Sequence, residues 1–375
     1  MRKAAFVYDE DLGWHTIVEG KVFNPTRLQY TYELLKAYHA FDESTAILVK
    51  PERADESALL SFHTERYVAA IKSFSKGEKK FNPRESNCGE HGDNPTFPGM
   101  YEVSTVIVGA SLKAAELVAE GKTDVAFNHA GGGHHAAPGC ASGFCIFNDV
   151  VIAIKYLLAR GLRIAYIDID AHHADGVQDA FYDTDKVLTV SLHETGRILF
   201  PGTGEVSEIG VGAGKGYSVN IPLAPYTDDE IYLWAFDQTV PALVGSYKPD
   251  IVFTQLGCDT HHIDPMTQLS LTTAGYEAVI KRLRKLAPRW VAVGGGGYEV
   301  SVVARCWTLA YGIMIDRELP DEIPQGYQEL YGLKRLRDTE KPYIVSRSKE
   351  QARRFAEESV AGVKRLVFPR HRLHE

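Results

Sequence analysis

The sequence predicts an α/β protein built on a mostly parallel β-sheet, and three observations support this fold class. Short runs rich in β-branched residues alternate with amphipathic segments of helix length along the 375 residues. Several of the apolar runs end in clusters of polar residues or glycine. No repeat, low-complexity tract or linker divides the chain, so we expect one domain over residues 1–375, with a core of about residues 1–315 and a C-terminal tail.

Six strands are predicted from apolar, β-branched runs bounded by turn residues. In chain order they cover residues 3–8, 124–128, 163–168, 187–191, 251–256 and 290–293. Helices are predicted where apolar residues recur at the spacing of one helix face. They cover residues 25–38, 101–119, 149–159, 228–244, 272–286, 300–315 and, packed on the core from the tail, 348–366. Residues 81–98 and 199–215 are rich in glycine, proline or charge, and they are predicted to be long surface loops.

The composition excludes some classes of function. The net charge of −8, with no long basic block, argues against a nucleic-acid ligand, because neutralising phosphates requires clustered lysine and arginine. It favours cationic substrates or basic protein segments instead. No stretch approaches 18 uninterrupted apolar residues, so no membrane span is predicted. The five cysteines form no CxxC pair and no signal peptide is visible, so we expect reduced thiols and a cytoplasmic location.

A metal site is predicted where one strand ends. Asp168, Asp170 and His172 follow the apolar residues 164–167 at two-residue spacing, so in an extended chain their side chains leave one face. Asp259 follows another predicted strand, and the carboxyl ends of parallel strands share one edge of the sheet. Asp170, His172 and Asp259 would provide three ligands for zinc or ferrous iron and leave positions open. The alternative is that the residues cap the helix that begins near Asp175.

Acid-base residues are predicted from a tandem histidine pair. His134 and His135 follow three glycines, which allow the backbone to approach a ligand closely. A histidine can take a proton from water at a metal and return it to a leaving amine, and Asp168 and Asp175 are available to orient the two imidazoles. Tyr298 follows four glycines and could donate a hydrogen bond to a developing oxyanion. The alternative is that these are core histidines and a core tyrosine.

Five motifs, in order between about residues 5 and 315, resemble a known family. They are His134-His135 with Gly143-Phe144-Cys145, the run from Tyr166 to Gln178, Phe200-Pro201-Gly202-Thr203-Gly204, Gly257-Cys258-Asp259, and Gly295-Gly296-Gly297-Tyr298. Together they resemble the zinc-dependent histone deacetylase family, and within it the prokaryotic acetoin-utilisation deacetylases. The resemblance implies the arginase–deacetylase fold, a parallel sheet of about eight strands flanked by helices.

The resemblance also implies a role for each site residue. Zinc would be held by Asp170, His172 and Asp259. The catalytic residues implied are His135 paired with Asp175 as general base and then acid, His134 paired with Asp168 for electrostatic help, and Tyr298 to polarise the acetamide carbonyl. The substrate would contact Asp93, Gly143, Phe144, Phe200 and Met266. A structural potassium ion would be bound by Asp168, Asp170, His172, Ser191 and Leu192.

The reaction expected from this resemblance is zinc-dependent hydrolysis of acetylated lysine side chains on proteins or peptides, which releases acetate and free lysine. Two alternatives stay open. The same fold also supports amidohydrolases for acetylpolyamines or other small amides, and these need a restricted mouth; the absence of a large insertion argues mildly against them. A non-catalytic binder of acyl-lysine has no need of Tyr298 or of histidine–aspartate pairs. His261 and His262 are unusual after Asp259, and we expect them on the surface; the alternatives are that they line the mouth of the site or bind a stray metal.

Overall fold

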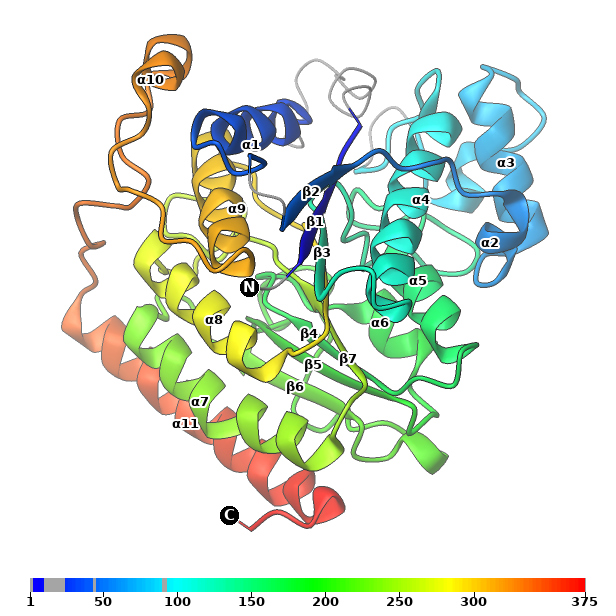
Figure 1. The fold of residues 1–375 in the computed structure, drawn as a ribbon. Coiled ribbons are helices and arrows are strands. Elements are labelled where there is room, and N and C mark those ends of the chain that lie inside the picture. Colours follow the sequence, from blue (N-terminus) through cyan, green and yellow to red (C-terminus); the bar gives the residue numbers. More distant parts are fainter. Residues whose placement is uncertain (1–2, 10–23, 43–44, 90–92, 375) are drawn as a thin grey trace.

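A parallel β-sheet forms the centre of the molecule (Figure 1). This computed structural model describes residues 3–9, 24–42, 45–89 and 93–374. Within those residues the sheet has eight strands in the order β2-β1-β3-β8-β7-β4-β5-β6, and every neighbouring pair is parallel. The strands are β1 (Ala4–Val7), β2 (Ala46–Val49), β3 (Val125–Asn128), β4 (Ile164–Asp168), β5 (Val187–Glu194), β6 (Ser218–Leu223), β7 (Ile251–Gln255) and β8 (Trp290–Val293). The predicted fold class is therefore confirmed.

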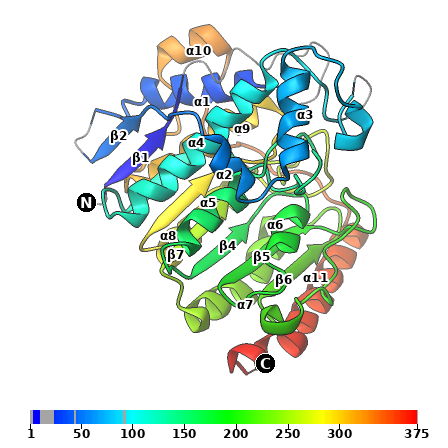
Figure 2. The same ribbon diagram turned by 90° about the vertical axis from the view of Figure 1, so that its right-hand side faces the viewer.

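Helices cover both faces of the sheet. They are α1 (Thr26–Ala37), α2 (Glu56–Leu60), α3 (Glu65–Ser75), α4 (Met100–Ala119), α5 (Asp149–Leu158), α6 (Asp175–Ala180), α7 (Asp229–Tyr247), α8 (Thr273–Leu286), α9 (Val300–Met314), α10 (Gln325–Tyr331) and α11 (Ser346–Leu366). Helices α7, α8 and α11 lie on one side of the sheet, and α4, α5 and α6 lie on the other (Figure 1). Figure 2 shows the strands side by side, from β2 at one edge to β6 at the other.

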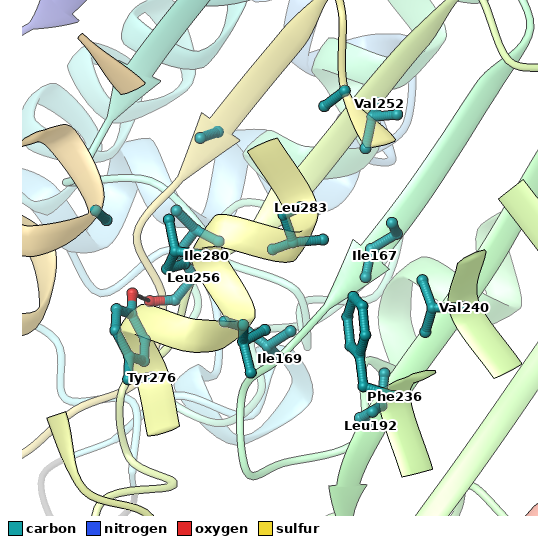
Figure 3. Close-up of a cluster of buried hydrophobic side chains, with 14 of the residues drawn as sticks. Ile167, Ile169, Leu192, Phe236, Val240, Val252, Leu256, Tyr276, Ile280 and Leu283 are labelled. Carbon is teal, nitrogen blue, oxygen red and sulfur yellow. Dashed lines mark hydrogen bonds between the residues drawn. The ribbon is translucent and has the colours of Figure 1, made fainter. Parts of the chain in front are cut away.

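The two cores follow from the alternation of side chains along each strand. Phe6 packs in the core that contains α7, α8 and α9, whereas its neighbours Ala5 and Val7 pack in the core with α4 and α5. Because both faces are covered, the strands are apolar along nearly their whole length, which is why they could be recognised in the sequence. Figure 3 shows part of the first core, where Phe236 and Val240 of α7 lie beside Ile167 of β4.

Each predicted strand and helix is present, and the predicted and observed ends differ by three residues at most. The largest differences are at the end of β5, predicted at 191 and found at Glu194, and at the end of α7, predicted at 244 and found at Tyr247. The predicted loop 199–215 contains one 3-10 turn at Gly212–Gly214. The described part of loop 81–98 contains another at Pro83–Ser86, and residues 90–92 lie outside the described residues.

Two strands were missed, and both are at the edges of the sheet. In β6, Ser218 and Asn220 alternate with apolar residues and bond to the Gln178 side chain, and Pro222 breaks the β-branched pattern. An edge strand tolerates proline because one side of its backbone has no neighbouring strand. In β2, Ile47 and Leu48 are partly exposed, so its four residues do not read as a buried strand.

The tail helix packs on the core, next to α7 and β6 (Figure 1). Its buried face joins the core through Ala352, Ala356, Val360 and Val363, and Ser359 Oγ donates a hydrogen bond of 2.8 Å to the carbonyl of Pro222. Among the described residues, none of the helices combines the length and apolar character needed to cross a bilayer.

Phe236 offers a direct test of the packing between α7 and the sheet. The side chain is fully buried, so we expect Phe236→Ala to lower the free energy of unfolding by about 3–5 kcal/mol through lost burial and a residual cavity. Equilibrium denaturant unfolding measures this change. The control is Ile47→Ala at the exposed edge strand, where 41% of the residue is accessible and a loss of about 1 kcal/mol or less is expected. Equal losses in the two variants would contradict the packing described.

Candidate metal centre and acid-base residues

The predicted site residues gather at the carboxyl ends of four neighbouring strands. Strands β3, β8, β7 and β4 are adjacent in the sheet, and each is followed by one of the polar or glycine-rich clusters. Loops leaving adjacent parallel strands at the same edge form the usual ligand-binding crevice of an α/β sheet. The convergence expected from the sequence is therefore present in the fold.

Asp170, His172 and Asp259 form a compact, buried group. Nδ1 of His172 lies 3.1 Å from Oδ1 of Asp170 and 3.0 Å from Oδ2 of Asp259. One ligand atom from each residue lies within 4.8 Å of the others, and all three residues are buried. Two carboxylates and one imidazole are a donor set that suits zinc or ferrous iron.

Two glycines make this group possible. A Cβ at Gly257 would lie 2.2 Å from Oδ2 of Asp170, and a Cβ at Gly296 would lie 2.0 Å from Oδ2 of Asp259. Only glycine allows the backbone to pass this close to the two carboxylates. The peptide N–H of Gly296 also donates to Oδ2 of Asp170 at 2.7 Å, which fixes the orientation of that carboxylate.

The charge of the group also fits a divalent cation. Burial and the neighbouring charge of Asp170 raise the pKa of Asp259. Two carboxylates buried this close together repel one another, and a cation between them removes that repulsion. The geometry, donor chemistry and charge of these three residues could therefore hold a divalent metal ion at the predicted position.

Each histidine of the tandem pair is backed by the carboxylate that the sequence suggested. Nδ1 of His134 lies 2.8 Å from Oδ2 of Asp168, and Nδ1 of His135 lies 2.6 Å from Oδ1 of Asp175. An ionised carboxylate only accepts hydrogen bonds, so each Nδ1 carries the proton and each Nε2 is available on the other side of the ring.

The two imidazoles have pKa values that are pushed apart. Burial lowers the pKa of the His134 imidazole, but the charges of Asp168 and Asp170 outweigh burial and raise it to about 9. Burial, followed by the nearby His134 charge, lowers the pKa of His135 to about 4. The ring centroids are 4.0 Å apart. A neutral imidazole beside a protonated one is an arrangement suited to a base next to a group that stabilises negative charge.

Tyr298 lies near the group of Asp170, His172 and Asp259. Its ring centroid is 6.4 Å from that of His172 and 5.8 Å from that of Phe144. Burial, with the charges of Asp259 and Asp170 adding to it, raises the pKa of the phenol well above its usual range. The hydroxyl therefore stays protonated and is able to donate a hydrogen bond.

A cavity of ≈ 150 Å³ leads to these residues. Among its lining residues are Asp93, His134, His135, Gly143, Phe144, Asp170 and Tyr298. Gly143 is required by close packing, because a Cβ there would lie 2.4 Å from the His135 ring and 3.0 Å from Phe200. Its φ of +49° also favours glycine. These seven residues are all predicted catalytic, metal or substrate positions, and they line one cavity.

Phe200 and Met266 are placed differently from the cavity lining. Phe200 is 43% exposed, and its ring centroid is 5.0 Å from that of His135 and 6.5 Å from that of His172. The Phe200 ring therefore lies on the solvent-exposed side of the His135 and His172 imidazoles. Met266 is half-buried, and its peptide N–H donates to Oδ1 of Asp264. Neither side chain belongs to the lining of the cavity as described.

The residues expected to bind potassium lie on neighbouring segments. Asp168 at the end of β4 pairs in register with Ser191 of β5, and Leu192 follows directly. The N–H of Glu194 donates a hydrogen bond of 2.9 Å to the carbonyl of Ala171. This bond joins β5 to the segment that carries Asp170 and His172.

Several polar residues that support the site were not predicted. The Gln255 amide donates to Oδ2 of Asp170 at 2.6 Å, and Asp149 accepts from the N–H of Gly133 at 2.7 Å. Asp264 accepts from the N–H of Tyr298 at 2.8 Å. Gln255 shares the signal that identified Asp168, since both are polar residues at the end of a buried strand. Asp149 and Asp264 are recognised only through their tertiary contacts.

His261 is buried, so its expected surface position is wrong. Its Nε2 lies 2.8 Å from Oδ2 of Asp338, and its ring stacks on His262 with centroids 4.6 Å apart. His261, His262 and Asp338 have ligand atoms close enough for a metal. However, the Arg305 guanidinium donates to Oδ1 of Asp338 at 2.6 Å and already neutralises that carboxylate. We therefore assign this cluster a structural role.

Comparison with known protein sequences identifies the family. Residues 21–314 match the model of the histone deacetylase domain. The chain is 41% identical over 333 residues to the acetoin utilization protein AcuC of Bacillus subtilis, with 86% of each chain covered. It is 36% identical over 335 residues to human histone deacetylase 1, which covers 88% of this chain and 68% of that protein.

Solved structures support the same conclusion. A crystal structure of an HDAC homologue from Aquifex aeolicus matches with a TM-score of 0.86 and 31% identity, and the match covers 96% of this chain and all of that one. An HDAC homologue complexed with SAHA matches with a TM-score of 0.87 and 32% identity, over 96% of this chain and 100% of that one. The expected arginase–deacetylase fold is thus confirmed. The chain is a hydrolase of the histone deacetylase family, in the branch that resembles AcuC.

Proposed function

We propose that the protein is a zinc-dependent deacetylase that hydrolyses the acetamide of acetylated lysine side chains. The observation that carries this proposal is the buried group of Asp170, His172 and Asp259 beside two histidine–aspartate pairs. Zinc held by these three residues would supply Lewis acidity, which polarises an amide carbonyl and acidifies water. Ferrous iron fits the same donors.

The chain's own residues divide the proton transfers between them. His135, neutral and oriented by Asp175, accepts the proton of the attacking water at Nε2 and later delivers it to the leaving lysine amine. His134, held by Asp168, carries positive charge that stabilises the negative charge developing on the amide oxygen. Tyr298 donates its hydroxyl proton in a hydrogen bond to the same oxygen.

The cavity suits an acylated lysine. Its stem of four methylene groups is apolar once the amine is acetylated, and aromatic side chains such as Phe144 favour such a surface. Phe200 covers the outer side of the imidazoles and Asp93 lies exposed at the cavity, where a carboxylate can accept hydrogen bonds from a substrate backbone. We propose Gly143 and Met266 as further substrate contacts. Acetylated proteins or peptides are the proposed substrates, and the cytoplasmic location and the lack of a nucleic-acid partner stay predictions.

A structural potassium ion is proposed on the same family resemblance. Carboxylate, hydroxyl and carbonyl oxygens of Asp168, Asp170, His172, Ser191 and Leu192 are the donors. The register of β4 with β5 supports this proposal, because it brings Asp168 next to Ser191.

An acyl-substrate panel tests the function. With the purified protein, we expect release of acetate from an acetyl-lysine peptide, loss of that activity with a chelator, and recovery on addition of zinc. Acetylputrescine is the comparison substrate. A strong preference for it would replace the lysine substrate by a polyamine, and peptide binding without turnover would indicate a non-catalytic reader.

Tyr298→Phe tests the oxyanion contact. The variant loses one hydrogen-bond donor, so we expect kcat to fall on the order of 10²-fold. Zinc content, measured by metal analysis, should stay at the wild-type level because the phenol is not a ligand. Wild-type kcat in this variant would remove the tyrosine from the mechanism.

Asp170→Ala tests the metal ligands. Removing one of three donors and one of two buried negative charges should abolish stoichiometric zinc binding, as measured by metal analysis after dialysis. Asp183→Ala, which removes an exposed carboxylate after α6, should leave zinc binding unchanged. Full zinc occupancy in Asp170→Ala would refute the ligand assignment.

A further inference from the structure

The segment that carries Tyr298 has little conformational restriction of its own. Residues 294–299 form neither helix nor strand between β8 and α9. Gly295 and Gly297 have φ values of +143° and +135°, in a region where glycine is the permissive residue. Consecutive glycines lose more entropy on ordering than other residues, so contacts from elsewhere must hold the phenol in place.

Three charged side chains bind the peptide groups of this segment. Asp170 accepts from the N–H of Gly296 at 2.7 Å, and Arg27 donates to the carbonyl of Gly297 at 2.8 Å. Asp264 accepts from the N–H of Tyr298 itself at 2.8 Å. Hydrogen bonds to charged groups are the strong ones, so Asp264 constrains the residue that bears the phenol most directly.

Asp264 is itself held in place, as a positioning residue must be. It is 6% exposed, its Oδ1 accepts from the N–H of Met266 at 3.0 Å, and its own N–H donates to the carbonyl of His261 at 2.9 Å. The two ends of the surrounding loop are joined, because Leu271 N–H donates to the carbonyl of Thr260 at 3.1 Å.

The loop is also anchored from the C-terminal segment. His261, three residues before Asp264, contacts Asp338, and Asp338 in turn accepts from Arg305 of α9. Oδ2 of Asp338 also accepts a hydrogen bond of 2.8 Å from the N–H of Thr273. Helix α9 begins two residues after Tyr298, so the carboxylate and the glycine-rich segment are fixed to the same framework.

We propose that Asp264 is a positioning residue, which fixes the backbone of Tyr298 so that the phenol meets the substrate's oxyanion. This inference rests on the proposed function, since it names what holds the proposed oxyanion donor. Asp264 touches neither substrate nor metal in this role. It acts only through Tyr298.

A double-mutant cycle tests the proposal. In Asp264→Asn an amide NH2 replaces one acceptor oxygen and the charge is lost, so we expect kcat on an acetyl-lysine peptide to fall about 10-fold with KM nearly unchanged. In the Tyr298→Phe background the same change should lower kcat less than about 2-fold, because the two residues act as one unit. Asp250→Asn is the matched control. Its exposed carboxylate also accepts from a backbone N–H, that of Arg163 at 2.7 Å, at the other end of the sheet.

Hydrogen–deuterium exchange gives a readout independent of activity. In the protein without substrate, the peptide that covers residues 294–299 should exchange faster in Asp264→Asn than in the wild type, and Asp250→Asn should not change it. Zinc content and thermal midpoint are measured in parallel to confirm a folded, loaded protein. If Asp264→Asn does not fold, Asp264→Ser, which is smaller and still accepts one hydrogen bond, takes its place.

The outcomes separate the two proposals. Equal losses of kcat in both backgrounds, or unchanged exchange of residues 294–299, would overturn the role of Asp264 while the deacetylase function stands. Absence of amide hydrolysis in the wild type would overturn the proposed function, and the exchange measurement would still decide whether Asp264 fixes the Tyr298 backbone.

Discussion

The repulsion between two buried carboxylates is the constraint around which the site is organised. Asp170 and Asp259 lie within reach of the same imidazole nitrogen and are shielded from water. Burying charges in this way is costly unless hydrogen bonds and opposite charge compensate for it. The peptide N–H of Gly296, the Gln255 amide and the protonated His134 each supply part of that compensation, and a divalent cation would supply the rest.

The parallel sheet is what brings the compensating groups together. Because β3, β8, β7 and β4 are adjacent and point the same way, residues more than a hundred positions apart reach one edge. Glycine then allows the loops to approach closely, as at Gly257 and Gly296, where any side chain would collide with a carboxylate. The glycines also leave the backbone of these loops with little conformational restriction. The polar contacts of Asp149 and Asp264 on the glycine-rich segments restrict that backbone.

The central strands and the cluster of polar residues that follows β4 could be predicted from sequence because both depend on local patterns. Buried parallel strands are apolar throughout, and the two-residue spacing of Asp168, Asp170 and His172 needs only an extended backbone to place them on one face. The edge strand β6 lacks that signal, because its Ser218 and Asn220 side chains bond to Gln178. Contacts such as His261 with Asp338 depend on how distant segments pack, and 77 residues separate these two, so no local pattern reveals them.

Asp338, near the C-terminal end of the chain, contacts His261 in the loop after β7 and Arg305 of α9. A shortened polypeptide that ended at Arg337 would still contain every candidate metal ligand and both histidine–aspartate pairs. Yet the imidazole of His261 and the guanidinium of Arg305 would then face one another inside the protein without the anion that separates them. A buried guanidinium left without its carboxylate is costly and favours a rearranged loop after β7, so the C-terminal segment and the conformation of that loop are thermodynamically linked.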